Sequence, residues 1–230
     1  MFSNFDYEII LRSLPYLFYD GMMFTLTLTF LATLGGIVFG TLLALMRLSG
    51  LAPLSLFAAG YVNLMRSVPL VLMIFWFYFL VPYLGQWATG ASRPIHVGPF
   101  ASSLVTFMVF EAAYFCEIMR AGIQSIPRGQ VFAAQALGMR YPATMAYVVL
   151  PQAFRNMVPV LLTQTIILFQ DTSLVYVLSI TDFLGAASKV AQRDGRLVEM
   201  YLFAAVVYFI ISFAASVLVR RLQSRTAIIR

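Results

Sequence analysis

The residues of this sequence best suited to chemistry are polar side chains that interrupt long apolar runs. Asp171 stands between Gln170 on one side and Thr172 and Ser173 on the other, with apolar residues beyond them. A charge at membrane depth is costly, so it is a functional hypothesis by default. We expect this cluster to interrupt a helix and face a cavity, where Asp171 would suit the ammonium of a zwitterionic solute. The alternative is hydrogen bonding between helices.

Four further charges fall near or within apolar runs. Glu111 either lines a substrate path or pairs with Gln164 or Gln170. Arg66 either attracts an acidic side chain of a substrate or anchors its helix at the membrane interface. Glu117 and Arg120 have the spacing of a local ion pair on one helix. The candidate substrate path therefore consists of Glu111, Gln164, Gln170, Asp171, Thr172, Ser173 and Arg66.

Several kinds of chemistry are excluded by the scarcity of reactive side chains. One cysteine, Cys116, cannot form an internal disulfide, and one histidine, His96, cannot build a His-rich metal site. The sequence has neither an HExxH motif nor a P-loop around its single lysine, Lys189. We therefore expect no catalytic residue, no metal and no cofactor on this chain. Any ATP-driven function needs a second chain.

Composition places these residues in an integral membrane protein. The chain has 230 residues, of which 61% are hydrophobic and only 10% charged, and its mean hydropathy is +0.88. Soluble domains carry about 25% charged residues. The net charge of +6 does not indicate nucleic acid, because the basic residues lie between long apolar runs.

Five apolar stretches are long enough to cross a bilayer as helices. They cover residues 22–46, 68–84, 100–118, 158–180 and 198–219. Ten of the fifteen Lys and Arg residues then fall on one side, which predicts a periplasmic N-terminus and a cytoplasmic C-terminus. Residues 1–20 are predicted as a periplasmic interfacial helix, residues 21–222 as the transmembrane domain and residues 223–230 as a cytoplasmic tail. Within the transmembrane domain, residues 49–64 are expected to form an interfacial helix that leads into the second span. Gly36 and Gly40 have a GxxxG spacing, which favours close helix packing.

The long segment between the third and fourth spans has its own pattern. A short helix is expected from Gln130 to Leu137, with Gly138 as the left-handed residue that ends it. Pro142 suits the first turn of a second short helix, which Pro151 is expected to end. Two short helices at a glycine elbow form a rigid knob that can carry force from a partner into the spans. The alternative is a surface loop packed on its own bundle.

This segment, residues 128–151, resembles the EAA coupling loop of ABC-importer permeases. The resemblance rests on QVFAAQALG at 130–138 and VLPQA at 149–153. Flanking motifs resemble the polar amino-acid uptake branch of that family: YFCEIMR at 114–120, GIQSIP at 122–127, RSVPL at 66–70 and QDTSL at 170–174, with Gly21, Thr25, Leu26, Gly40 and Arg47 near the start. Residues 169–183 and 193–195 look most like glutamate/aspartate permeases.

The resemblance implies an all-α membrane protein with five transmembrane helices, similar to a type I ABC importer with a cytoplasmic coupling helix. It implies import of a polar amino acid across the bacterial inner membrane. The implied partners are a cytoplasmic P-loop ATPase in two copies, which holds ATP and Mg²⁺, an identical or homologous second permease and a periplasmic binding protein. A self-sufficient secondary transporter or channel is the alternative, although no internal repeat supports it.

The coupling residues implied by the resemblance are Gln130, Phe132, Ala133, Ala134, Ala136, Leu137, Gly138 and Pro151. One position departs from the family pattern, because the loop glutamate of the family falls at Phe132. A charged contact with the ATPase is then absent. We expect Phe132 to fill an apolar groove on that partner instead, as a buried aromatic anchor does.

Overall fold

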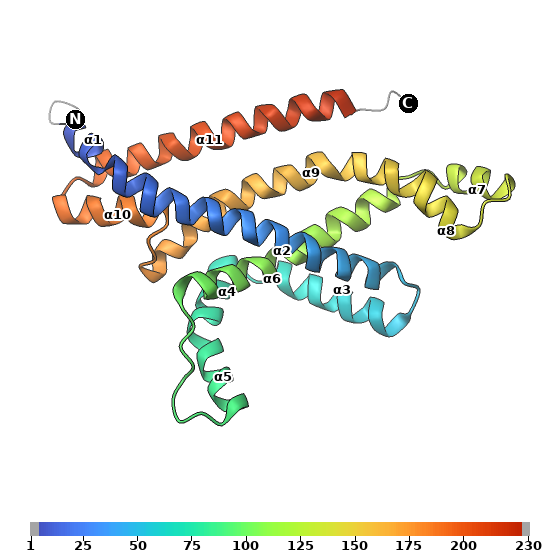
Figure 1. Ribbon diagram of the computed structural model, residues 1–230, viewed down its shortest axis with the longest axis horizontal. Coiled ribbons are helices and arrows are strands. Elements are labelled where there is room, and N and C mark those ends of the chain that lie inside the picture. The colour runs from blue at the N-terminus through green and yellow to red at the C-terminus, as the bar shows by residue number, and fades with distance from the viewer. Residues whose placement is uncertain (1–4, 227–230) are drawn as a thin grey trace.

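The fold is a bundle of long helices drawn out along one axis, seen in a computed structural model that describes residues 5–226 and their side chains through residue 224 (Figure 1). Predictions on residues 1–4 and 227–230, including Arg230 and the end of the tail, lie outside these residues. The elements are α1 (Tyr7–Pro15), η1 (Tyr16–Met22), α2 (Met23–Leu48), α3 (Ala52–Ser67), α4 (Leu70–Phe75), η2 (Trp76–Leu80), α5 (Val81–Thr89), α6 (Pro99–Gln124), α7 (Arg128–Ala136), α8 (Tyr141–Thr144), η3 (Met145–Val149), α9 (Leu150–Asp171), η4 (Thr172–Leu178), α10 (Phe183–Asp194) and α11 (Leu197–Thr226).

Five helical segments are long and apolar enough to cross a membrane, which confirms the predicted number of spans. They cover residues 7–48, 70–89, 99–124, 141–178 and 197–224. The first begins earlier than expected, because α1 and η1 lead into α2 without a break. Residues 7–22 therefore form the start of the first long helix and not a separate helix.

Prolines explain two of the π-helical segments of the described residues, η2 and η3. The segment η2 precedes Pro82 and contains Tyr78, while η3 precedes Pro151 and contains Tyr147. In each case the tyrosine is four residues before the proline, so its carbonyl would meet the proline ring in a regular α-helix. A π turn moves this carbonyl aside, and the helix continues. The prediction that Pro151 ends a helix is therefore wrong.

The packing of α2 against α6 forms the centre of the bundle. A Cβ at Gly36 would lie 2.9 Å from the ring of Phe115, and one at Gly40 would lie 2.7 Å from the Cβ of Phe115. Neither residue has room for a side chain, which confirms that the GxxxG spacing serves close helix packing. On its other side α6 packs against α3, where the hydroxyl of Tyr61 donates to the carbonyl of Val109 at 2.6 Å.

The segment between α6 and α9 projects from one end of the bundle (Figure 1). We call residues 128–149 the knob. Its helix α7 ends in a Schellman motif: Met139 N–H donates to Ala134 O at 3.1 Å, and Gly138 N–H donates to Gln135 O at 2.9 Å. Gly138 has a φ of +82°, as the sequence predicted for the residue that ends this helix.

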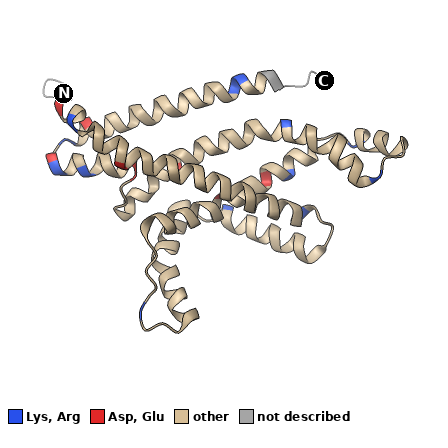
Figure 2. Ribbon diagram, in the orientation of Figure 1, with Lys and Arg blue, Asp and Glu red and all other residues tan. Residues whose placement is uncertain are grey.

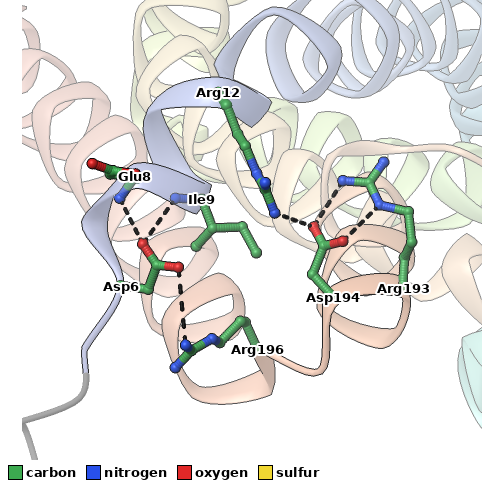
Figure 3. A network of polar contacts seen from close by, with 7 residues as sticks. All are labelled: Asp6, Glu8, Ile9, Arg12, Arg193, Asp194 and Arg196. Atoms are coloured by element: carbon green, nitrogen blue, oxygen red, sulfur yellow. Dashed lines mark hydrogen bonds and ion pairs between the residues drawn. The ribbon is translucent and has the colours of Figure 1, made fainter.

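Most acidic side chains gather at the opposite end of the molecule, near α1 and α10 (Figure 2). Arg12 of α1 pairs with Asp194 at 3.0 Å, and Arg193 pairs with the same carboxylate at 2.8 Å. Asp6 lies 4.0 Å from Arg196 (Figure 3). This network ties the first helix to the turn between α10 and α11.

Asp182 caps α10 from a fully buried position. Its carboxylate accepts from Leu184 N–H at 3.0 Å and Gly185 N–H at 2.9 Å, while Phe183 N–H donates to the hydroxyl of Thr25 at 3.0 Å. Burial raises the pKa of Asp182 from 3.8 to about 7, against the opposing effect of the two N–H donors and of Lys189. Thr25, another residue of the predicted motif set, therefore serves to join α2 to α10.

Replacing Gly40 with alanine tests the α2–α6 contact. The new methyl group meets a Cβ and a backbone carbonyl that cannot swing away, so we expect a loss of about 1–3 kcal/mol in the free energy of unfolding. The matched control is Gly60→Ala in α3, where nothing lies within 4 Å of the added Cβ. The control should keep or slightly raise the melting temperature in detergent. Equal melting temperatures for both variants would contradict the packing argument.

The buried cap at Asp182 makes stability depend on pH. Because its folded-state pKa of about 7 lies above the ordinary value of 3.8, its contribution is complete below about pH 4 and is lost as the pH rises to about 7. We expect the melting temperature of the wild-type protein to fall between pH 5 and pH 8. Asp182→Asn keeps an N-cap acceptor but cannot titrate, so its curve should be flatter. Identical pH profiles would count against this assignment.

Candidate functional site

A cavity of about 490 Å³ opens where the end of α3, the start of α4, α6 and α9 meet. Four residues of the predicted substrate path line it: Arg66, Glu111, Gln164 and Asp171. The other wall residues are Ser67, Val68, Pro69, Leu70, Phe110, Tyr114 and Ile167. The cavity therefore combines one guanidinium, two carboxylates and one amide with apolar walls.

Helical periodicity places these side chains together. On α9, Gln164, Ile167 and Asp171 are three and four residues apart, so they share one face of the helix. On α6, Glu111 and Tyr114 are three apart and share the facing surface. The third wall is irregular backbone between α3 and α4. There Val68 takes an extended conformation, with φ −106° and ψ 133°, as the residue before a proline does.

Glu111 is the most deeply buried polar group of the cavity, with no exposed surface. Its Oε2 accepts a hydrogen bond from the side-chain amide of Gln164 at 3.0 Å, which confirms one of the two partners that the sequence suggested. Its Oε1 is also buried and has no hydrogen-bond partner. A buried carboxylate oxygen without a donor carries a free-energy penalty, which a bound ammonium or hydroxyl would remove.

Arg66 lies over the ring of Tyr114, with its guanidinium carbon 5.5 Å from the ring centre. The contact is a cation–π interaction, which orients the guanidinium and leaves its N–H groups to an anion. The side chain is otherwise exposed. Sequence reasoning did not assign Tyr114 to the site, although its position three residues after Glu111 is a signal that would have found it.

Three of the four polar residues in the run 170–173 face away from the central cavity. Gln170 and Ser173 line a different cavity of about 390 Å³, together with Tyr208, Ser212 and other residues of α11. Thr172 is fully buried, and its hydroxyl donates to the carbonyl of Phe169 at 2.7 Å. The α-helix does give way to a 3₁₀ helix at Thr172, as expected for this cluster. Asp171 alone of the four points into the central cavity.

A third cavity, of about 400 Å³, continues along the same faces of α6 and α9 toward the knob. On α6 the cavity-lining residues run from Tyr114 in the central cavity to Glu117 in the third one. On α9 they run from Gln164 in the central cavity to Val160 and Asn156 in the third one. These steps are three or four residues, so the two cavities lie end to end along one helix–helix groove. At the far end the amide of Asn156 donates to the hydroxyl of Ser125 at 2.9 Å.

Glu117 joins two arginines beside this groove. It pairs with Arg120 at 2.6 Å, which confirms the local pair predicted from the sequence. It also pairs with Arg47 at the end of α2, a contact that spacing along one helix does not reveal. Arg120 in addition donates to Gln124 at 2.6 Å. The network ties α2 to α6 at the end from which the knob projects.

This arrangement can bind and release a small charged molecule. Within residues 5–226 there is no group of three or more His, Cys, Asp or Glu side chains that would hold a metal ion. The cavity offers carboxylates for a cation and a guanidinium for an anion, which is what a zwitterionic amino acid requires.

Comparison with known proteins identifies the family. Residues 36–228 match the family described as binding-protein-dependent transport system inner membrane component. The chain belongs to this family. It is therefore an inner membrane permease subunit of an ABC importer, and the homologous permeases leave ATP hydrolysis to a separate subunit. Membership also implies an ATPase partner and a binding protein.

Individual relatives extend over the whole chain. The glutamate/aspartate import permease protein GltK of Escherichia coli O157:H7 is 56% identical over 224 residues, which are 97% of this chain and 99% of the relative. The glutamine transport system permease protein GlnP of Escherichia coli K12 is 32% identical over 226 residues, 98% of this chain and 100% of the relative.

Solved structures show the same fold. An amino acid ABC transporter crystallised with histidines superposes with a TM-score of 0.86 at 31% identity, over 96% of this chain and 98% of that one. The inward-facing MetNI methionine ABC transporter has a TM-score of 0.72 at 21% identity, over 93% and 97% of the two chains. The all-helical permease fold expected from the sequence is thus confirmed.

Removing the carboxylate of Glu117 tests the arginine network. The variant Glu117→Ala leaves Arg47 and Arg120 close together without a counter-charge, and these side chains are only 18% and 29% exposed. We expect a loss of about 1–3 kcal/mol in the free energy of unfolding, less than for a fully buried pair. As a control, Arg193→Ala removes a partner that is 64% exposed and should leave the melting temperature close to that of the wild type. Thermal unfolding in detergent compares the two, and a larger loss for the control would refute the argument.

Proposed function

We propose that this permease imports an acidic amino acid, glutamate or aspartate, and that the central cavity is its substrate site. The strongest support is the 56% identity over nearly the whole chain to a glutamate/aspartate import permease. The cavity chemistry agrees with this substrate class, because a guanidinium faces two carboxylates across one space.

Each part of the substrate has a partner in the cavity. The α-ammonium binds Asp171 and the unpartnered Oε1 of Glu111, and charge-assisted hydrogen bonds of this kind are the strong ones. The substrate carboxylates bind Arg66, which Tyr114 orients from below. Gln164 holds Glu111 in place. After release from the cavity the substrate follows the groove between α6 and α9 past Glu117 to Asn156.

The importer has two permease subunits, this chain and a second one, with a cytoplasmic ATPase subunit under each. In the predicted topology ten of the fifteen basic residues of the sequence fall on the same side as residues 128–151, so the side that carries the knob is cytoplasmic and the N-terminus is periplasmic. ATP and Mg²⁺ bind the ATPase subunits. The residues that couple their closure to the permease are Gln130, Phe132, Ala133, Ala134, Ala136, Leu137, Gly138 and Pro151, all in or beside the knob.

Uptake by the reconstituted importer tests this proposal. With its ATPase, second permease and glutamate-loaded binding protein in proteoliposomes, the wild-type chain should accumulate labelled glutamate only when ATP is present. Asp171→Asn should lower this uptake about 10- to 100-fold, because it removes a charge-assisted hydrogen bond of about 1.5–3 kcal/mol. Ser173→Ala is the matched control, since Ser173 faces a different cavity and its loss should leave uptake within about two-fold.

Two outcomes would sink the proposal. The substrate assignment fails if the wild-type importer takes up glutamine but neither glutamate nor aspartate. The site assignment fails if uptake by Asp171→Asn equals that of Ser173→Ala while both variants insert and assemble normally.

A further inference from the structure

A separate cavity of about 320 Å³ opens at the end of the molecule opposite the knob, between the start of the first long helix and α10. None of its wall residues belongs to the proposed substrate site. Its volume lies at the lower end of the range of small-molecule sites, which is about 300–1,000 Å³. The wall consists of Arg12, Ser13, Tyr16, Val190, Arg193 and Asp194.

Ser13 brings a buried hydroxyl to this wall. The residue is 4% exposed, and its hydroxyl forms no hydrogen bond within the part of the chain that the structure describes. A buried hydroxyl without a partner carries a free-energy penalty, which a hydrogen bond to a ligand in the cavity would remove. Because a hydroxyl can donate, the oxygen of an anion is a suitable partner.

Arg12 and Arg193 bring positive charge to the same cavity. Both donate to the carboxylate of Asp194, Arg12 through Nη2 and Arg193 through Nε and Nη2 (Figure 3). The Nη1 groups of the two arginines have no partner among the described residues. Two guanidiniums and one carboxylate leave the wall with a net positive charge. The cavity therefore favours an anion.

The other carboxylates at this end of the molecule are engaged outside the cavity. Asp6 lies 4.0 Å from Arg196, and Glu199 pairs with the same arginine at 3.2 Å. Figure 3 shows Asp6 and Glu8 together, away from Asp194. Within the described residues, Asp194 is the one carboxylate in the cavity wall, and two arginines already neutralise it.

The cavity lies at the depth of lipid headgroups. Arg47 follows Arg12 by 35 residues on one continuous helical stretch, a distance of about 50 Å. A bilayer with its headgroups is about 40–45 Å thick, and the usual tilt of membrane helices fits the stretch to this thickness. With Arg47 at one headgroup layer, Arg12 is thus at the other. The fifth span agrees, because it begins at Leu197, three residues after Asp194.

The surface beside the cavity suits the rest of a lipid molecule. The helical stretch that carries Arg12 exposes Tyr7 by 69%, Leu11 by 65% and Tyr19 by 78%. Tyrosines are enriched where membrane helices cross the headgroup layer, and an exposed leucine there can contact acyl chains. A headgroup in the cavity would therefore leave its chains on an apolar surface.

We propose that this cavity binds the phosphate group of a membrane phospholipid, with Arg12 and Arg193 as charged donors and Ser13 as a neutral one. Arginine forms strong, charge-assisted hydrogen bonds with phosphate oxygens. The bound headgroup joins the first long helix to the turn between α10 and α11, in addition to the bridge through Asp194. The proposal depends on the membrane location of the chain and not on its substrate.

Lipid binding to the assembled importer in mild detergent, measured by native mass spectrometry, tests this proposal. Three probes separate the possible sources of the phosphate. They are dihexanoyl-phosphatidylglycerol, the same headgroup without chains as glycerophosphoglycerol, and the same chains without phosphate as dihexanoylglycerol. The phosphatidylglycerol should bind at least about 10-fold more tightly than either of the others, because it alone offers both phosphate and apolar surface. Equal binding of glycerophosphoglycerol would identify a free phosphate compound as the ligand, and equal binding of dihexanoylglycerol would show that phosphate is not recognised.

Variants of the two arginines locate the site. Arg12→Gln and Arg193→Gln should each weaken binding of the phosphatidylglycerol about 10- to 100-fold, and the double variant should retain one molecule fewer for each copy of this chain. Arg93→Gln is the matched control and should bind as the wild type. Arg93 is exposed in the loop between α5 and α6, which is predicted to lie on the same side of the membrane. Since the two site arginines are 62% and 64% exposed, their variants should unfold at the wild-type temperature when no lipid is added.

Ser13→Ala separates a ligand contact from a structural role. It should weaken binding of the phosphatidylglycerol about 2- to 10-fold, as the loss of a neutral hydrogen bond does. Without lipid it should keep or raise the melting temperature, because it removes a buried hydroxyl that has no partner among the described residues. A lower melting temperature in lipid-free detergent, together with wild-type lipid binding, would give Ser13 a structural role and contradict its place in the site.

The double arginine variant decides the proposal. If it retains as many phosphatidylglycerol molecules as the wild type, the cavity binds no lipid and the proposal fails. If, in addition, the variant weakens docking of the binding protein to the importer, the cavity serves that protein and not the membrane. Neither result bears on glutamate uptake by the wild type, so the proposed function is tested separately.

Discussion

The close packing of α2 against α6 is the contact on which the rest of the structure depends. It is possible because Gly36 and Gly40 leave no side chain between the helices, so that Phe115 and the Cβ of Glu111 lie directly on the backbone of α2. Glu111 is thereby buried in a fixed position, where Gln164 satisfies one of its oxygens. A carboxylate at this depth would be expensive in a mobile surrounding. The rigid pair of helices makes it a fixed element of the cavity, and the second oxygen remains available to a ligand.

Breaks in helical structure lie where function needs irregular backbone. The non-helical backbone at Val68 and Pro69 forms part of one wall of the central cavity. The change to a 3₁₀ helix after Asp171 separates the polar side chains of that run. Irregular backbone at membrane depth is tolerated where it lines a cavity or is buried in protein. Pro151 has a different role, because the π turn before it keeps the helix continuous from the knob into the fourth span. A proline that ended this helix would instead have separated the knob from the span.

Much of this fold could be predicted from the sequence, because the membrane allows few solutions. The lengths of the apolar stretches predicted the five spans, and Gly138 predicted the left-handed residue at the end of α7. Predictions of contacts between distant segments were less complete. The pairing of Arg47 with Glu117 depends on how α2 crosses α6, and the separation of Gln170 from Asp171 depends on which helix lies on each side of α9. Spacing along one helix shows which residues share a face, but only tertiary packing shows what that face meets.

The central cavity, the groove and the knob are all built on the same two helices, and this has a mechanical consequence. One face of α6 carries Glu111 and Tyr114 and then Glu117, and α9 carries Asp171 and Gln164 and then Asn156. Both helices reach the core of Val149, Ala153 and Met157 that holds the knob. The knob is continuous with α9, and residues 125–127 link it to α6, so a displacement of the knob moves both walls of the groove through this shared core. Because packed interiors transmit strain and do not deform freely, we propose that a force applied to the knob changes the spacing between Glu111 and Asp171.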